Sequence, residues 1–145
     1  TFIGSAIAAN ICERGFSARY QRAHEWFAEF SFARAQGSLP KLRARLARTK
    51  LLIIDEWLRE PLTSAHARDL LDVIDDRYRK ASCMFISQLP VPDWHGQIQD
   101  PTLADALLDR LVHDALRLEL KGESMRKLTS PLKGKNSSLR SEALD

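Results

Sequence analysis

The 145-residue sequence predicts an α/β fold, a doubly wound parallel sheet with helices on both faces. The clearest sign is residues 51–54, Leu-Leu-Ile-Ile, which lead directly into Asp55 and Glu56. Four consecutive aliphatic residues are typical of a strand that is buried on both faces, as strands of parallel sheets are. A second sign is the alternation of such strands with segments of helical periodicity along the chain.

The first part of the chain predicts three helices and one short strand. Residues 2–14 have alanines and isoleucines at helical spacing, and Gly15 is a typical stop for this helix. Residues 17–21 are a strand candidate. Two consecutive helices, 24–35 and 39–48, depart from a simple strand–helix–strand rhythm. Bulky aromatic residues of the first of these two helices are expected in the core: Trp26, Phe27 and Phe30.

After the strand 51–55, the alternation of helices and strands continues. Thr63 is a suitable N-cap for a helix over residues 64–79, whose apolar residues recur at helical spacing. A second buried strand is predicted over 83–87, and another helix over 102–114. Residues 116–120 alternate leucine with charged residues, which predicts a further strand.

Beyond Leu128 the sequence loses its periodicity and is rich in Ser, Pro, Gly, Lys and Asn. We therefore expect an ordered domain over residues 1–128 and a disordered basic tail over residues 129–145. At the other end, Thr1 stands where a complete reading frame would have Met, and the helical pattern begins without a cap. The sequence is therefore expected to be part of a longer reading frame.

Composition favours a cytoplasmic protein without a membrane partner. Hydrophobic residues make up 44% and charged residues 28%, which is ordinary for a globular protein. No apolar run approaches the roughly 20 residues of a membrane span, and no secretory leader is recognisable. Cys12 and Cys83 have no CxxC spacing, so core thiols in a reducing cytosol are expected rather than a metal or redox site.

The acidic pair that follows the strand 51–55 is the main candidate for chemistry. Asp55 and Glu56 are expected at the carboxyl edge of the sheet, where open α/β folds bind their ligands. One carboxylate there can hold the water shell of a magnesium ion, and the second can orient an attacking water. This is the form of a Walker B motif. A buried strand that simply ends in a solvated acidic turn is an equally good interpretation of these six residues alone.

Positive charge is modest in total, +3, but unevenly distributed. Basic patches on a balanced chain favour a polyanionic partner, nucleic acid first. The alternative is a solvated helix face. The predicted contacts are five basic residues without one intervening acid: Lys41, Arg43, Arg45, Arg48 and Lys50.

Four blocks together resemble the ATPases of the IstB/DnaC group within the AAA+ class, and most specifically the IstB-like helper ATPases of insertion-sequence transposons. They are residues 51–57, 86–90, 100–111 and 120–127, and the likeness spans residues 1 to about 127. It implies a P-loop NTPase of AAA+ type with a three-layer parallel sheet. It also implies that the first strand and most of the phosphate-binding loop precede Thr1, so that this chain alone is expected to lack ATPase activity.

The resemblance also implies a set of roles around ATP and Mg²⁺. Thr1 and Asp55 would hold the metal and nucleotide, and Glu56 would position the hydrolytic water. Gln88 would be the polar sensor, although a strand-end polar residue is the simpler alternative. Arg110 would reach the nucleotide of a neighbouring subunit, and pairing with Asp114 is its alternative. Arg126 would contact phosphate within its own subunit.

The implied function is ATP binding and hydrolysis in a helper of DNA transposition. Its implied partners are double-stranded DNA, reached through the five basic residues, a transposase, and further copies of itself that meet at ATP interfaces. Two alternatives stay open: a DnaC-like loader of a replicative helicase, and an inactive gene remnant. The block 100–111 favours the transposition helper.

Overall fold

The computed structural model describes residues 2–120. Contacts divide the chain into two units, Thr1–Ala115 and Leu116–Asp145. Every helix and strand of the described residues belongs to the first unit. The description that follows concerns this unit.

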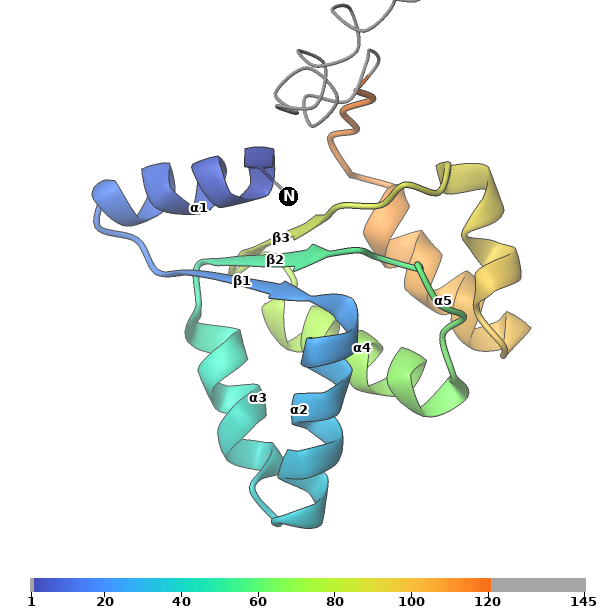
Figure 1. The fold of residues 1–145 in the computed structure, drawn as a ribbon. Helices are drawn as coiled ribbons and strands as arrows, with labels where there is room; N and C mark the ends of the chain where they lie inside the picture. Colours follow the sequence, from blue (N-terminus) through green and yellow to red (C-terminus); the bar gives the residue numbers. More distant parts are fainter. Residues whose placement is uncertain (1, 121–145) are drawn as a thin grey trace, which may run out of the picture. The chain divides into compact units, whose positions relative to one another are not determined.

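Helices and strands alternate as the sequence predicts, with two helices between the first and second strands (Figure 1). In chain order the elements are α1 (Phe2–Glu13), β1 (Ala18–Arg22), α2 (Ala23–Ala35), α3 (Leu39–Arg48), β2 (Leu51–Asp55), α4 (Ser64–Arg77), β3 (Ser82–Phe85), the 3₁₀ turns η1 (Val91–Asp93) and η2 (His95–Gln97), and α5 (Pro101–Val112).

The three strands form one parallel sheet in the order β1-β2-β3. The central strand β2 aligns Ile54 with Phe85 of β3, and Asp55 with Arg22 of β1. Leu52, Ile53 and Ile54 are completely buried, which confirms the prediction of a strand covered on both faces. Because the strands are parallel, all three end at the same edge of the sheet.

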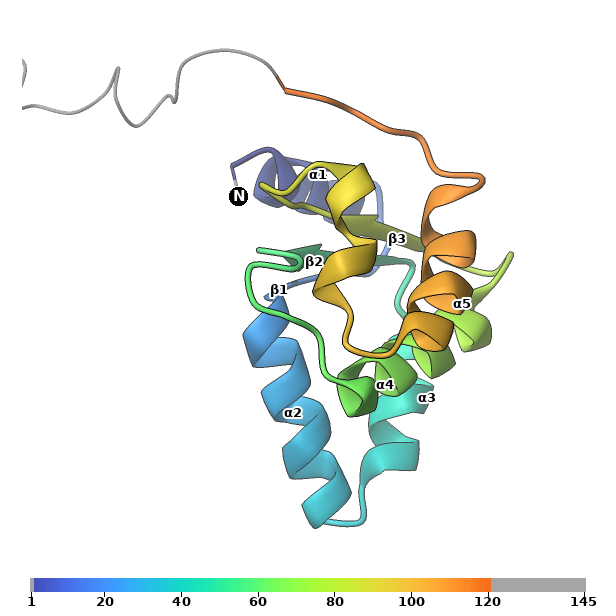
Figure 2. The same ribbon diagram turned by 90° about the vertical axis from the view of Figure 1, so that its right-hand side faces the viewer.

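Helices cover the sheet on both sides and give three layers, as predicted. Helix α1 packs against β1 and β2 on one face, whereas α2, α3 and α4 lie on the opposite face (Figures 1 and 2). Helix α5 packs against α4 and η2. Trp26 and Phe30 of α2 stack at 4.2 Å between ring centroids and are 0% and 1% exposed. These aromatic residues are therefore part of the core, as expected.

Three sequence expectations are wrong. The second buried strand, predicted over 83–87, is β3 over Ser82–Phe85, and its residues are exposed or partly buried because it lies at the edge of the three described strands. Residues 116–120 form no strand, and Leu116 is 89% exposed. Alternation alone does not make a strand, because a strand needs a neighbouring strand for its backbone groups, and the sheet of the described residues consists of β1, β2 and β3. Both cysteines are expected in the core, but Cys12 of α1 is exposed and Cys83 is partly buried against the core. The predicted tail, residues 129–145, and the predicted domain end at residue 128 lie outside the described residues.

Gly4 allows α1 to approach the sheet closely. A Cβ atom at this position would lie 2.5 Å from Cδ1 of Ile86 and 3.2 Å from Cε2 of Tyr20. Real Cβ contacts are not that short, so a side chain here would force Ile86 and Tyr20 to shift. Gly4 thus fixes the spacing between α1 and the strands that carry the acidic residues.

We expect Gly4→Val to lower the free energy of unfolding by about 2 kcal/mol, because it overpacks a close helix–sheet contact. Gly96→Val is the matched control, since a Cβ atom at Gly96 would meet nothing within 4 Å. Chemical denaturation of the two variants measures the difference. Equal stabilities would contradict the close packing of α1.

Candidate functional site

The carboxyl ends of β2 and β3 lie side by side, and their pairing continues beyond both strands. The Ile86 N–H donates to the Ile54 carbonyl at 3.0 Å, and the Trp57 N–H donates to the Ile86 carbonyl at 2.9 Å. The segment that contains Glu56 therefore runs beside the segment that leads to Gln88. This is the edge at which the sequence predicts a nucleotide site.

Asp55 is the last residue of β2, and its carboxylate is held from two sides. It is 3% exposed. The Tyr20 hydroxyl of β1 donates to Oδ2, and the backbone N–H of Glu56 donates to Oδ1 at 2.8 Å. A carboxylate oxygen can accept more than one hydrogen bond, so these contacts orient the group while leaving acceptor capacity. Tyr20 is a site residue that the sequence did not reveal, because its role depends on the register between β1 and β2.

Glu56 lies just past the strand in a left-handed backbone conformation, with φ of 55°. Its side chain is 27% exposed and is surrounded by basic groups. Arg59 donates to Oε2 at 3.0 Å, the Arg22 guanidinium lies 3.9 Å from Oε1, and His24 Nδ1 lies 4.0 Å from Oε2. The Glu56 carboxylate thus lies near solvent, among three basic side chains and next to the buried Asp55.

Gln88 is exposed and stands three residues beyond the end of β3, which finishes at Phe85, earlier than the predicted Ser87. A defined turn presents it. The Ser87 hydroxyl donates to the Trp57 carbonyl at 2.8 Å and accepts from the Leu89 N–H at 3.0 Å. The turn is therefore tied to the segment that follows Glu56.

A pocket of about 620 Å³ opens beside Glu56. It lies between α2 and the segment from β2 to α4. One wall is the Phe27 ring of α2, which stacks on the His66 imidazole of α4 at 4.3 Å between ring centroids. Arg59 and Thr63 also line it.

The donor set fits a magnesium ion that is bound mainly by a nucleotide. No group of three or more potential metal-binding side chains occurs in the part of the chain that the structure describes. Mg²⁺ is usually held by one or two carboxylates together with substrate phosphates and water, rather than by a cage of protein ligands. The oriented carboxylate of Asp55 matches that mode. Thr1 and Arg126, the other predicted nucleotide ligands, lie outside the described residues.

Arg110 of α5 pairs with an acid of another helix. Its Nε donates to Oδ1 of Asp75 at 2.6 Å, and its NH1 donates to the Ala106 carbonyl. This ion pair replaces the pairing with Asp114 that was the alternative from sequence. The guanidinium is about one-third exposed.

The predicted DNA-binding run is divided by ion pairs. Arg43 lies 2.9 Å from Asp72 and 2.8 Å from Asp76, and its hydrogen bond with Asp76 raises its pKa above the ordinary value. Arg45 pairs with Glu29. Among the described residues, no carboxylate pairs with the rest of the run: Lys41, Arg48 and Lys50.

Glu29 of α2 is the centre of a small charge network. Burial pushes its pKa upward, but hydrogen bonds from Arg19 and Gln21 and the charges of Arg19 and Arg45 outweigh burial, and the net pKa is lowered. The ionised form is therefore favoured in the folded protein. Arg45 is engaged in stabilising this carboxylate.

We expect Glu29→Gln to reduce stability by about 1 kcal/mol at neutral pH. Because folding lowers the pKa below 4.5, the contribution is present above that value and is lost as the pH falls through the folded pKa. The difference between wild type and variant should therefore shrink below about pH 5. Unfolding curves between pH 3 and 8 test this, with Glu60→Gln as an exposed control. A difference that is constant with pH would contradict the network.

These features define a class: an α/β domain with a central parallel strand that ends in an oriented acidic pair, as in nucleotide-binding ATPases. Comparison with known proteins agrees. The model of the family "IstB-like ATP binding protein" matches residues 1–132. The chain is 42% identical over 127 residues to an insertion sequence ATP-binding protein, y4pL, of Sinorhizobium fredii, covering 88% of this chain and 52% of that protein. The chain therefore belongs to the IstB-like ATP-binding protein family.

Solved structures support the fold assignment. AMPPCP-bound DnaA from Aquifex aeolicus superposes with a TM-score of 0.65 at 14% identity, over 92% of this chain and 41% of DnaA. A replication initiator DnaA bound to AMPPCP and single-stranded DNA gives a TM-score of 0.60 at 13% identity, over 71% and 32% of the two chains. The fold is thus that of AAA+ P-loop ATPases, as predicted. The chain spans about half the length of the curated relatives it matches.

No helix of residues 2–120 is both long and apolar enough to cross a membrane.

Proposed function

We propose that this chain is part of an ATP-binding and ATP-hydrolysing helper of DNA transposition. The observation that carries the proposal is the acidic pair at the end of β2, with Asp55 oriented by Tyr20 and Glu56 exposed beside it. Membership of the IstB-like family supports ATP as the nucleotide. The residues present are suited to Mg²⁺ as the metal.

Asp55 and Glu56 have different environments, which supports different roles. Asp55 is buried and fixed, so it suits a metal-bound water shell; Mg²⁺ there would neutralise charge on the transferred phosphate. Glu56 is partly exposed and suits positioning of a water for in-line attack. Arg59 donates to Oε2, so Oε1 keeps the capacity to accept a proton. Gln88, presented beside it, is proposed as a polar contact to the phosphate or the water.

Assembly with further copies of the protein is part of the proposal. Arg110 lies on the surface of α5, and its guanidinium suits contact with the phosphates of a nucleotide bound to a neighbouring subunit. Arg126 is proposed to contact phosphate within its own subunit, and Thr1 to contribute its hydroxyl to the metal. The proposed partners are double-stranded DNA and a transposase. Relatives named as insertion sequence ATP-binding proteins support this context.

In the protein that includes the phosphate-binding loop, we expect Glu56→Gln to retain ATP binding and to lower hydrolysis about 100-fold, because an amide cannot accept a proton. Glu60→Gln removes the same charge four residues away and is the control. Steady-state phosphate release and binding of a fluorescent ATP analogue measure the two properties. A rate for Glu56→Gln within about twofold of wild type would assign Glu56 a structural role.

Arg110→Ala in the same protein should lower ATPase activity and spare ATP binding by the monomer. Mixing it with Glu56→Gln protein should restore part of the activity, because one interface then pairs an intact Glu56 with an intact Arg110. Asp75→Asn is the matched control, since it removes the ion pair of Arg110 but keeps the guanidinium. No recovery at any mixing ratio, with assembly confirmed by light scattering, would show that Arg110 does not act between subunits.

A further inference from the structure

Ion pairs between helices neutralise some of the arginines of this protein and leave other basic residues without an acidic partner among residues 2–120. Helix α4 carries four aspartates, and each pairs with an arginine of another helix. The pairs are Asp69 with Arg34 of α2, Asp72 and Asp76 with Arg43 of α3, and Asp75 with Arg110 of α5. These contacts neutralise the acidic helix, and they also occupy arginines that would otherwise be free to bind a polyanion.

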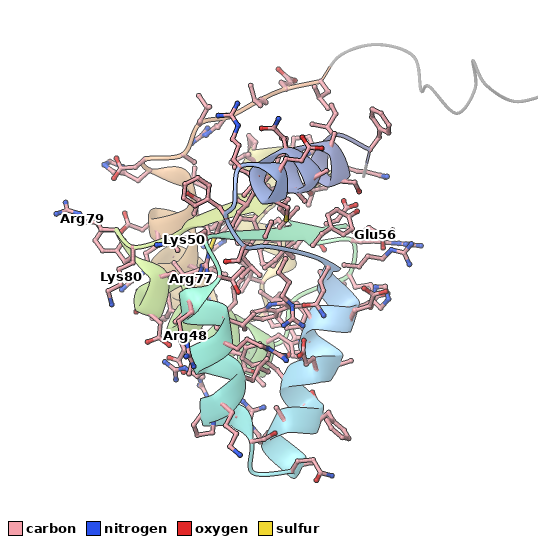
Figure 3. All side chains as sticks on the ribbon, turned by 90° about the vertical axis from the view of Figure 1, so that its left-hand side faces the viewer. Arg48, Lys50, Glu56, Arg77, Arg79 and Lys80 are labelled. Atoms are coloured by element: carbon pink, nitrogen blue, oxygen red, sulfur yellow. The ribbon has the colours of Figure 1, made fainter. Side chains whose placement is uncertain are left out.

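Four other cations gather at the amino edge of the sheet, on the turns that lead into β2 and β3. We call this set the amino-edge patch: Arg48, Lys50, Arg79 and Lys80. All four are exposed. Within residues 2–120 none of them forms an ion pair. Arg48 donates to the Ala44 carbonyl of its own helix, and Lys80 donates to the Asp76 carbonyl of the helix that precedes its turn. Figure 3 shows them together on one side of the molecule, with Glu56 at the opposite side.

Backbone hydrogen bonds hold the turns of the patch together. The Ser82 N–H donates to the Lys50 carbonyl at 2.9 Å, and the Leu51 N–H donates to the Ser17 carbonyl at 3.0 Å. The three turns that meet there, residues 14–17, 48–50 and 78–81, contain no Asp or Glu. Positive charge at this edge is therefore not offset by acids within the same turns.

Arg77 lies beneath the patch and fixes it. Its buried guanidinium donates to the Thr49 carbonyl at 2.7 Å and to the Ser82 carbonyl at 2.6 Å. One side chain thus joins the turn of Lys50 to the turn of Lys80. The cations above it are presented by an ordered backbone, which lowers the entropy lost when they bind a ligand.

Arg79 is positioned by its own backbone and by an aromatic ring. It has a left-handed φ of 57°, and its guanidinium carbon lies 5.3 Å from the centre of the Tyr78 ring. A cation–π contact of this kind directs an arginine without neutralising it. The charge of Arg79 stays available at the surface.

We propose that the amino-edge patch binds the phosphate backbone of duplex DNA. The choice of DNA as the partner rests on the proposed function. The surface differs from the one predicted from sequence, which was the basic run of residues 41–50. The proposal assigns Arg48 and Lys50 to DNA together with Arg79 and Lys80, and excludes Arg43 and Arg45, which are held by acids. It also excludes Lys41, which lies in the first turn of α3, at the opposite end of that helix from Arg48. Contacts to phosphate carry no sequence information, so affinity through this patch should vary little with DNA sequence.

Distance keeps the patch apart from the acidic edge. Five residues of β2 separate Lys50 from Glu56, which corresponds to roughly 16 Å of strand. The Debye length at physiological salt is about 8 Å. The partly exposed carboxylate of Glu56 is therefore largely screened from a DNA molecule bound at the patch, and a nucleotide and DNA could occupy the two edges together.

The test measures binding of the full-length protein to an unrelated 30-base-pair duplex by fluorescence anisotropy at several salt concentrations. The patch variant is Lys50→Gln/Lys80→Gln. The matched control is Lys41→Gln/Arg68→Gln, which removes two exposed charges elsewhere on α3 and α4. We expect the slope of log affinity against log salt to fall by about 1.8 for the patch variant, and to stay at the wild-type value for the control.

Arg79→Gly is an independent variant that adds no new side chain to the fold. Glycine adopts a positive φ without steric cost, so this variant should fold as well as wild type while losing one phosphate contact and about 0.9 of slope. Thermal unfolding confirms the fold. Wild-type slopes for both Arg79→Gly and the patch variant would overturn the proposal, as would an equal loss in the control.

Two further outcomes separate this inference from the proposed function. Tighter binding of a 30-nucleotide single strand through the same residues would overturn the assignment to duplex DNA. ATPase activity is measured on the wild-type preparation without DNA. If the protein binds duplex DNA through the patch but hydrolyses no ATP, the proposed function is contradicted and the inference stands. If it hydrolyses ATP and the variants bind DNA as wild type does, the inference alone is contradicted.

Discussion

The guanidinium of Arg77 holds together the segments on which the rest of the structure depends. It is 1% exposed and donates to the carbonyls of Leu46, Thr49 and Ser82 and to the sulfur of Cys83. Carbonyls at the end of α3 carry the negative end of the helix dipole, which offsets a buried positive charge that no carboxylate among residues 2–120 pairs with. Loss of the donor to a buried carbonyl costs about 1–3 kcal/mol where no other donor replaces it; the Leu46 carbonyl would keep the Thr49 N–H at 3.2 Å. Arg77 therefore sets where β2 and β3 begin.

A fixed start for parallel strands also fixes where they end. Because β2 pairs in register with both neighbours, the position at which it begins, after Lys50, also determines the position of Asp55 at its other end. Asp55 then lies within reach of the Tyr20 hydroxyl on the next strand. Gly4 affects the same edge from above the sheet, because it allows α1 to pack closely against Tyr20 and Ile86. Geometry at the acidic edge is thus a consequence of contacts made mostly elsewhere.

Local sequence patterns predicted the helices and strands that depend on neighbouring residues. They did not predict contacts between residues that are far apart in the sequence. The strand 51–55 and the helix 39–48 are found with the predicted bounds, because aliphatic runs and helical spacing are local signals. Arg43 pairs with Asp72 and Asp76, which are about thirty positions away in the sequence, and no periodic pattern predicts such a contact. The bond from Tyr20 to Asp55 requires the register of two strands. Residues 116–120 have the alternation of a strand but no partner strand among the described residues.

Both edges of the sheet place a charged residue in a left-handed conformation, Glu56 at one end and Arg79 at the other. For residues with a side chain this conformation costs about 1–2 kcal/mol, and it persists only where the surrounding structure determines the backbone. Here the determinants are different: the bonds between Ile86 and the β2 end hold Glu56, and the Arg77 contacts hold the turn of Arg79. The two strained residues are therefore held by separate sets of hydrogen bonds, although the register of β2 links the edges that carry them. Under the proposed function, a nucleotide at the carboxyl edge and DNA at the amino edge would each meet a backbone that the fold has already fixed.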